Sequence, residues 1–120
     1  MRPMLIVLLL IALCGCRRTP PTMAGSKWAA ALHDPDTKLR KKAVFTLGNI
    51  GPSDPVVLPA LIGALRDANA EVRCEAILAL VKYGPGAGEA VSALIEVQQQ
   101  DRDAQVRTYA AEALAKLQGG

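Results

Sequence analysis

Aspartate and arginine recur together along this chain, at a spacing that could bring opposite charges into contact three times. Each of three arginines lies six residues after an aspartate, and successive pairs are 33 and 34 residues apart. The pairs are Asp34 with Arg40, Asp67 with Arg73, and Asp101 with Arg107. A guanidinium group matches a carboxylate and nearby carbonyls, so hydrogen bonding by these pairs is chemically reasonable. An anion site made by the three arginines is the other interpretation.

Residues that could support catalysis or bind a metal are sparse. His33 is the only histidine, and nothing near it supplies an obvious nucleophile or orienting partner. Glu71 and Glu75 lie one helical turn apart, but with no histidine beside them we interpret them as part of a solvated face. The glycine-rich stretch 84–88 follows a predicted helix, whereas a phosphate-binding loop follows a strand. We therefore predict no catalytic, cofactor or metal site, and binding in place of turnover.

Cysteine usage excludes a disulfide framework and paired-cysteine metal sites. Cys74 is the only cysteine outside the first 16 residues. In the other two repeats, the position equivalent to Cys74 is occupied by the polar residues Lys41 and Thr108. We therefore expect an exposed thiol, and a homodimer linked through Cys74 is a hypothesis that a non-reducing gel would test.

The elements that must position these residues are predicted to be helices. Apolar residues follow the charged pairs at constant offsets, and self-similarity at this period indicates stacked helical units. They are Leu39, Val72 and Val106; Ala43, Ala76 and Ala110; and Leu47, Leu80 and Leu114. We predict an all-α fold, a short α-solenoid of about three helix-turn-helix repeats. The first helices of the repeats are expected at 26–33, 54–66 and about 89–100, and the second helices at 37–49, 70–83 and 104–118.

Glycine, proline and one tryptophan refine this assignment. Gly-Pro pairs at 51–52 and 84–85 are expected to end second helices, because glycine accepts the closing conformation and proline cannot continue the ladder. Pro59 is expected to bend the helix at 54–66. Trp28 occupies the position of Leu61 in the next repeat, so we interpret it as part of the core.

The repeated unit resembles the HEAT repeat, and most closely the short subtype named after phycobilisome lyases. The resemblance covers residues 26–120 and is carried by the motif D-x-x-x-x-(V/L)-R-x-x-A-x-x-x-L, which begins at Asp34, Asp67 and Asp101. It implies repeats at about 26–51, 52–84 and 85–120, with the aspartates and arginines linking neighbouring repeats in a ladder of hydrogen bonds. We favour this ladder over the anion site because repeated units share their stacking interfaces. It also implies a protein-binding scaffold. A bilin lyase or its accessory subunit, and a structural fragment or self-associating domain, stay open as alternatives.

The second helices usually line the concave side of such solenoids, so their polar positions are the expected partner contacts. These positions are Lys41, Lys42, Cys74, Glu75, Thr108 and Glu112. The partner is expected to be another protein whose identity the sequence does not reveal. The formal charge of +3 is too close to neutral to indicate nucleic acid binding.

The first residues are predicted to be an export signal. Met4 to Leu13 is an apolar run too short to span a bilayer as a helix. The sequence Leu13-Cys14-Gly15-Cys16 resembles the bacterial lipoprotein signal, which implies cleavage after Gly15 and acylation of Cys16, with diacylglycerol on its sulfur and palmitate among the acyl chains. An ordinary cleaved signal or an uncleaved anchor is the alternative.

The segment after the signal is predicted to be a tether. Residues 1–15 would be the signal peptide, 16–25 the lipidated cysteine with a proline-rich tether, and 26–120 the repeat domain. Arg17 and Arg18 would lie beside lipid headgroups or in a solvated linker. The expected location is a bacterial envelope membrane, and whether it is the inner or the outer membrane stays open.

Overall fold

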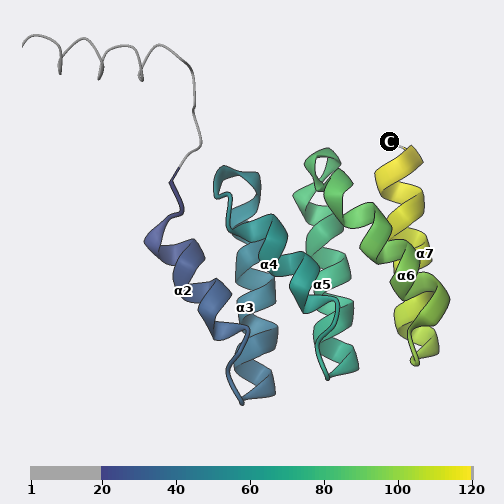
Figure 1. The fold of residues 1–120 in the computed structure, drawn as a ribbon, viewed down its shortest axis with the longest axis horizontal. Helices are drawn as coiled ribbons and strands as arrows, with labels where there is room; N and C mark the ends of the chain where they lie inside the picture. Colours follow the sequence, from purple (N-terminus) through teal and green to yellow (C-terminus); the bar gives the residue numbers. More distant parts are fainter. Residues whose placement is uncertain (1–19, 120) are drawn as a thin grey trace, which may run out of the picture.

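A computed structural model describes residues 20–119, which form six α-helices and two short 3₁₀ helices and contain no strand (Figure 1). The elements in chain order are α2 (Met23–Ala31), α3 (Thr37–Ile50), η1 (Gly51–Ser53), α4 (Val57–Ala64), α5 (Ala70–Tyr83), η2 (Pro85–Ala90), α6 (Val91–Gln100) and α7 (Ala104–Gly119). The predicted signal peptide, Cys16 and the first part of the tether lie outside these residues. Within them, no helix is both long and apolar enough to cross a bilayer.

The helices are arranged in two rows. The second helices α3, α5 and α7 pack against one another in order, and each also contacts the first helix of its own repeat, α2, α4 or α6 (Figure 1). All three first-to-second turns lie at one end of the stack, and η1 and η2 lie at the other (Figure 1). The predicted short all-α solenoid is confirmed.

The core follows the internal period of the sequence. Ala43, Ala76 and Ala110 are fully buried, because small side chains let the second helices approach closely. Leu47 and Leu80 are also fully buried, and each contributes about 1.5–3 kcal/mol through the apolar area removed from water. The apolar stripe predicted from the repeats is therefore the surface along which the rows join.

Glycine and proline act largely as expected at the ends of the second helices. Gly51 and Gly84 follow α3 and α5 with φ of 66° and 91°, a conformation that other residues rarely adopt. Pro59 differs from expectation, because α4 begins at Val57 and places this proline in the first turn. The N–H of a first-turn residue has no hydrogen-bond partner within the helix, so a proline there disrupts nothing. The bend predicted at Pro59 therefore has no physical cause.

The starts of the first helices were predicted incorrectly. Helix α2 begins at Met23, three residues before the predicted Ser26, because the Thr22 side chain caps it by accepting from the Gly25 N–H at 2.9 Å. Part of the predicted tether is therefore helical. The other two first helices begin later than predicted, at Val57 and Val91, because η1 and η2 occupy the chain before them.

Candidate binding surface

Three repeated turns prepare the charged groups of the ladder. In each, the carboxylate of the ladder aspartate accepts a hydrogen bond from the N–H two residues later, at 2.8–2.9 Å. The side chains that then cap the second helices are Asp36, Asn69 and Asp103. Asp and Asn favour such turns because their short side chains reach the following backbone. The same chemistry therefore fixes the start of the second helix and the orientation of the ladder carboxylate.

Arg73 shows the complete ladder geometry. Its Nε and Nη2 donate to the two carboxylate oxygens of Asp101 in the next repeat, at 2.9 and 3.1 Å. Its Nη1 donates to the carbonyls of Asp67 and Ala68 in its own repeat, at 2.8 and 3.2 Å. The Arg73 and Asp101 side chains are only 6% and 8% exposed. One side chain thus holds two successive turns together.

Arg40 makes the same four hydrogen bonds as Arg73, the fourth to the Pro35 carbonyl, whereas Arg107 makes one of them. Arg40 donates to both carboxylate oxygens of Asp67, at 3.0 and 3.2 Å, and to the Asp34 carbonyl at 2.9 Å. Arg107 donates to the Asp101 carbonyl at 2.6 Å, and no ion pair to Arg107 is found within residues 20–119. The structure therefore brings together two cross-repeat pairs and leaves Arg107 with a contact inside its own repeat.

The ladder perturbs the protonation of its members. Burial acts to raise the pKa of Asp101, but the Asp103 N–H and the Arg73 guanidinium outweigh it and lower that pKa below its usual value. Hydrogen bonding to the Asp67 carboxylate raises the pKa of Arg40 above that of a free arginine. Both groups are therefore held in their charged forms.

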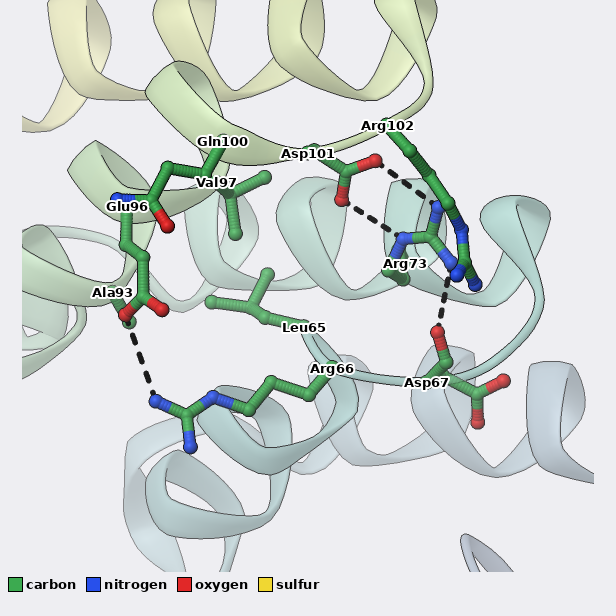
Figure 2. A pocket seen from close by; sticks show the side chains of 10 residues that line it. All are labelled: Leu65, Arg66, Asp67, Arg73, Ala93, Glu96, Val97, Gln100, Asp101 and Arg102. Atoms are coloured by element: carbon green, nitrogen blue, oxygen red, sulfur yellow. Dashed lines mark hydrogen bonds and ion pairs between the residues drawn. The ribbon is translucent and has the colours of Figure 1, made fainter.

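A groove of about 330 Å³ lies over the ladder between the α4–α5 turn and α6 (Figure 2). Arg66 pairs with Glu96 at 3.6 Å, Arg73 with Asp101, and Arg102 donates to the Ala68 carbonyl at 3.2 Å. Figure 2 shows Arg102 running alongside Arg73. Because each of these arginines already has an acceptor, the groove offers little to an incoming anion.

A second groove, of about 470 Å³, lies along α5 between α3 and α7, and we call it the second-helix groove. Its lining residues are Lys41, Ala70, Glu71, Cys74, Glu75, Leu78, Asp103, Gln105 and Tyr109. Three of the predicted partner contacts, Lys41, Cys74 and Glu75, meet there. Lys42 lies instead beside Trp28, and Thr108 and Glu112 are exposed on α7 outside the lining.

Sequence reasoning missed the apolar residues of this surface. Leu78 is 47% exposed and lines the groove with Tyr109, and Phe45, at the equivalent position of α3 outside the lining, is 56% exposed. Phe45 and Leu78 are 33 residues apart and off the buried stripe of their helices. That repetition of an apolar residue at an outward position was the signal that could have found them.

Cys74 was predicted to be exposed, and this prediction is wrong. Its side chain is half-buried and packs against the core. Burial raises the pKa of the Cys74 thiol above its usual value. The longer Lys41 side chain extends further into solvent from the equivalent position than the short cysteine does.

His33 lies at the mouth of a third groove, of about 600 Å³, between α2 and α4. The lining is mostly apolar, and Arg66 and Asp67 supply its charged groups. Within the described part of the chain, no three metal-ligating side chains cluster together. This groove assembles no nucleophile with an orienting base.

Comparisons with known proteins agree with this geometry. A family model described as HEAT repeats matches residues 25–115, a range that contains all three Asp–Arg pairs and the second-helix groove. No curated protein matches the chain.

Proposed function

The chain belongs to the HEAT-repeat family, and from this premise we propose that it is a non-catalytic protein-interaction module anchored to a bacterial envelope membrane by lipid on Cys16. HEAT repeats commonly mediate protein–protein interaction, and the family is generally non-catalytic. The stack itself would present a surface to a partner, as repeat solenoids do.

The observation that carries the proposal is the composition of the second-helix groove. Leu78 and Tyr109 supply apolar area in a hollow, and Glu71, Glu75 and Asp103 surround them with carboxylates. Apolar anchors inside a polar rim are typical of protein interfaces. The excess of acid favours a partner segment that carries an apolar or aromatic anchor with basic residues beside it.

The anchor is supported by the residues around Cys16. After the apolar run, Leu13 stands three residues before Cys16 and Gly15 immediately before it, as in a lipoprotein signal, whereas Cys14 differs from the usual small residue. Two or three acyl chains would hold the protein firmly, because each buried CH₂ contributes about 0.8 kcal/mol. Labelled palmitate that enters the full chain but not a Cys16→Ser variant would support the anchor, and equal labelling would contradict it.

The grooves of residues 20–119 support binding more than catalysis. Of three grooves within these residues, one is lined by paired ladder charges, another is mostly apolar, and a further one is the second-helix groove. A bilin lyase would need side chains that hold and activate a chromophore. Co-expression with bilin tests that alternative directly, and we expect a colourless protein.

Affinity capture with matched variants tests the interaction surface. The full chain would be solubilised from membranes, and the captured proteins compared with those of Leu78→Glu and Ile95→Glu variants. Both residues are exposed, at 47% and 37%, but Ile95 lies on α6 outside the groove. Loss of an anchor at the centre of an interface costs at least about 2 kcal/mol, or about thirtyfold in affinity. We expect the partner to be lost with Leu78→Glu and retained with Ile95→Glu, and equal behaviour of the variants would contradict the assignment.

A further inference from the structure

We propose that a basic–aromatic patch on α2, α3 and the end of α5 docks on the anionic phospholipid surface that carries the anchor. The patch consists of Lys27, Trp28, Lys38, Lys42, Phe45 and Lys82. The inference deepens the membrane anchoring proposed above and rests on it for the position of the patch. It assigns the α3 side of the stack to lipid and leaves the second-helix groove to the protein partner.

Charge is distributed unevenly between the two parts of the chain. Residues 16–49 contain seven Lys and Arg residues against two Asp and Glu, whereas residues 50–120 contain six against nine. Helix α3 carries four basic residues and no acidic one. The part of the chain next to Cys16 is therefore basic and the remainder is acidic, so an anionic surface would attract the first and repel the second.

Aromatic side chains lie among these lysines. The Nζ atoms of Lys27 and Lys42 are 5.7 and 5.8 Å from the centre of the Trp28 ring, and the Lys82 Nζ is 5.4 Å from the centre of the Phe45 ring. Trp28 and Phe45 are the only Trp and the only Phe of the chain. An amphipathic tryptophan beside lysines is typical of the membrane–water interface, where the ring meets the headgroups and the amines meet phosphate, and the phenyl ring of Phe45 would add apolar contact.

The start of α2 is fastened to the core, which fixes where the tether joins the domain. The Thr22 N–H and hydroxyl both donate to Asp54 Oδ2, at 2.9 and 2.6 Å, and the Asp54 side chain is fully buried. Thr22 lies six residues after Cys16, a distance of at most about 20 Å in a fully extended chain. Helix α2 is only about 14 Å long, so the patch stays within reach of the headgroups.

An acidic protein is the other occupant that a basic patch could attract, and the surroundings favour lipid. Met23, the first residue of α2, is 91% exposed and would add apolar contact at the same edge. A tethered domain meets the bilayer at a high effective concentration, whereas a soluble partner must be captured from solution. The anchor and the patch therefore form two signals for one membrane, the combination that gives stable attachment.

Trp28 is a natural probe for the test. The acylated full chain would be placed on vesicles of phosphatidylcholine alone, or of equal parts phosphatidylcholine and phosphatidylglycerol, with and without nitroxide-labelled lipid. We expect a blue shift and nitroxide quenching of Trp28 on the anionic vesicles, and less of both on the neutral ones. Neutralising one lysine should lower the ratio of docked to undocked chain about fivefold.

Matched variants separate the patch from general charge. A Lys27→Gln/Lys42→Gln variant should lower that ratio about 25-fold, whereas Lys116→Gln, at the exposed lysine on α7, should leave it unchanged. Each variant is compared with its own emission on neutral vesicles, because Lys27 and Lys42 lie beside the ring. Flotation of the Cys16→Ser chain with anionic vesicles gives a readout that does not depend on tryptophan.

The outcomes distinguish this inference from the proposed function. If the acylated chain floats with both vesicle types but Trp28 responds equally to both, the patch assignment is overturned and the anchor stands. If the chain is not acylated, the proposed anchor is wrong. Flotation of the chain with anionic vesicles would then support the patch, and no flotation would contradict it. Binding of an acidic protein through these lysines, without any response to anionic vesicles, would also overturn the assignment to lipid.

Discussion

Replacing Arg73 by methionine tests whether the ladder is the main polar link between repeats. Methionine keeps much of the arginine's volume but removes four hydrogen bonds, two to the Asp101 carboxylate and two to backbone carbonyls. The Asp101 carboxylate, 8% exposed, would then keep only the N–H of Asp103. Breaking a buried ion pair by removing one partner costs about 3–5 kcal/mol. Arg102 lies beside Arg73 and offsets part of the lost charge, so we expect about 3 kcal/mol (Figure 2).

The assay is equilibrium unfolding in urea, followed by far-ultraviolet circular dichroism on the mature chain with Cys16→Ser. A loss of about 3 kcal/mol is a large part of the 5–15 kcal/mol that stabilises most domains. It corresponds to a fall in Tm of roughly 12 °C or more in a domain of this size. The slope of the unfolding curve should stay the same, since the surface exposed on unfolding does not change.

Arg107→Met is the matched control. Arg107 occupies the same position in the third repeat, but its hydrogen bond goes to the Asp101 carbonyl rather than to a carboxylate of another repeat. We expect a loss of about 1 kcal/mol from this variant. Equal losses from the two variants, or a loss below 1 kcal/mol from Arg73→Met, would refute the idea that the cross-repeat pair stabilises the stack.

The pH dependence of the unfolding free energy is an independent test of the Arg73→Met variant. In the folded protein the pKa of Asp101 is lowered, so its contribution to stability is present above the unfolded value of about 3.9 and is lost as pH falls through the folded pKa. Arg73→Met removes much of that contribution. The difference in unfolding free energy between wild type and variant should therefore narrow as pH falls below about 4. A difference that stays constant down to acid pH would argue against the electrostatic explanation.

Three further predictions concern α2 and Cys74. A Cβ on Gly25 would collide with the Asp54 carboxylate, so Gly25→Ala should loosen α2, shift Trp28 emission to the red and lower the Tm by about 5 °C or more in thermal unfolding. The hydrogen bond from the Thr22 hydroxyl is the main cause of the lowered pKa of Asp54. As pH falls below about 3.9, α2 should therefore loosen and Trp28 fluorescence should change, and a Thr22→Val variant should lack this change. Burial raises the pKa of Cys74, so its thiol should react slowly with a thiol reagent at neutral pH and faster at alkaline pH; a dimer on a non-reducing gel that Cys74→Ser abolishes would support the homodimer hypothesis.

The stack could be predicted because its determinants repeat. The spacing of Asp34, Asp67 and Asp101 fixes the period, and the apolar residues at constant offsets fix which side of each second helix is buried. Glycine at 51 and 84 supplies the positive φ that ends a helix. Each of these signals acts within a few residues of the element that it determines, and three copies confirm one another.

The features that were missed depend on contacts between distant residues or on side-chain length. Asp54 accepts from Thr22, 32 residues away, and this pair has no counterpart in the ladder, so the start of α2 could not be read from the period. In the other repeats, lysine and threonine occupy the position of Cys74. Their polarity does not determine the exposure of a short cysteine side chain at that position. The position alone therefore predicted exposure, whereas burial followed from the size of the residue.

The distribution of lysines along the stack follows neither from the repeat period nor from the fold. The ladder arginines are engaged by carboxylates or backbone carbonyls, so they contribute little to the charge that a partner meets. The lysines have no such repeat, and five of the six lie on α2, α3 and α5. The Asp–Arg pairs recur in every repeat and stabilise the stack. The lysines gather at one end of the stack and can therefore orient the protein on a membrane. If so, exchanging the three lysines of α3 for the neutral residues at the equivalent positions of α7 (Gln, Thr and Tyr) should leave the unfolding free energy almost unchanged, while it abolishes the preference of the anchored chain for anionic vesicles.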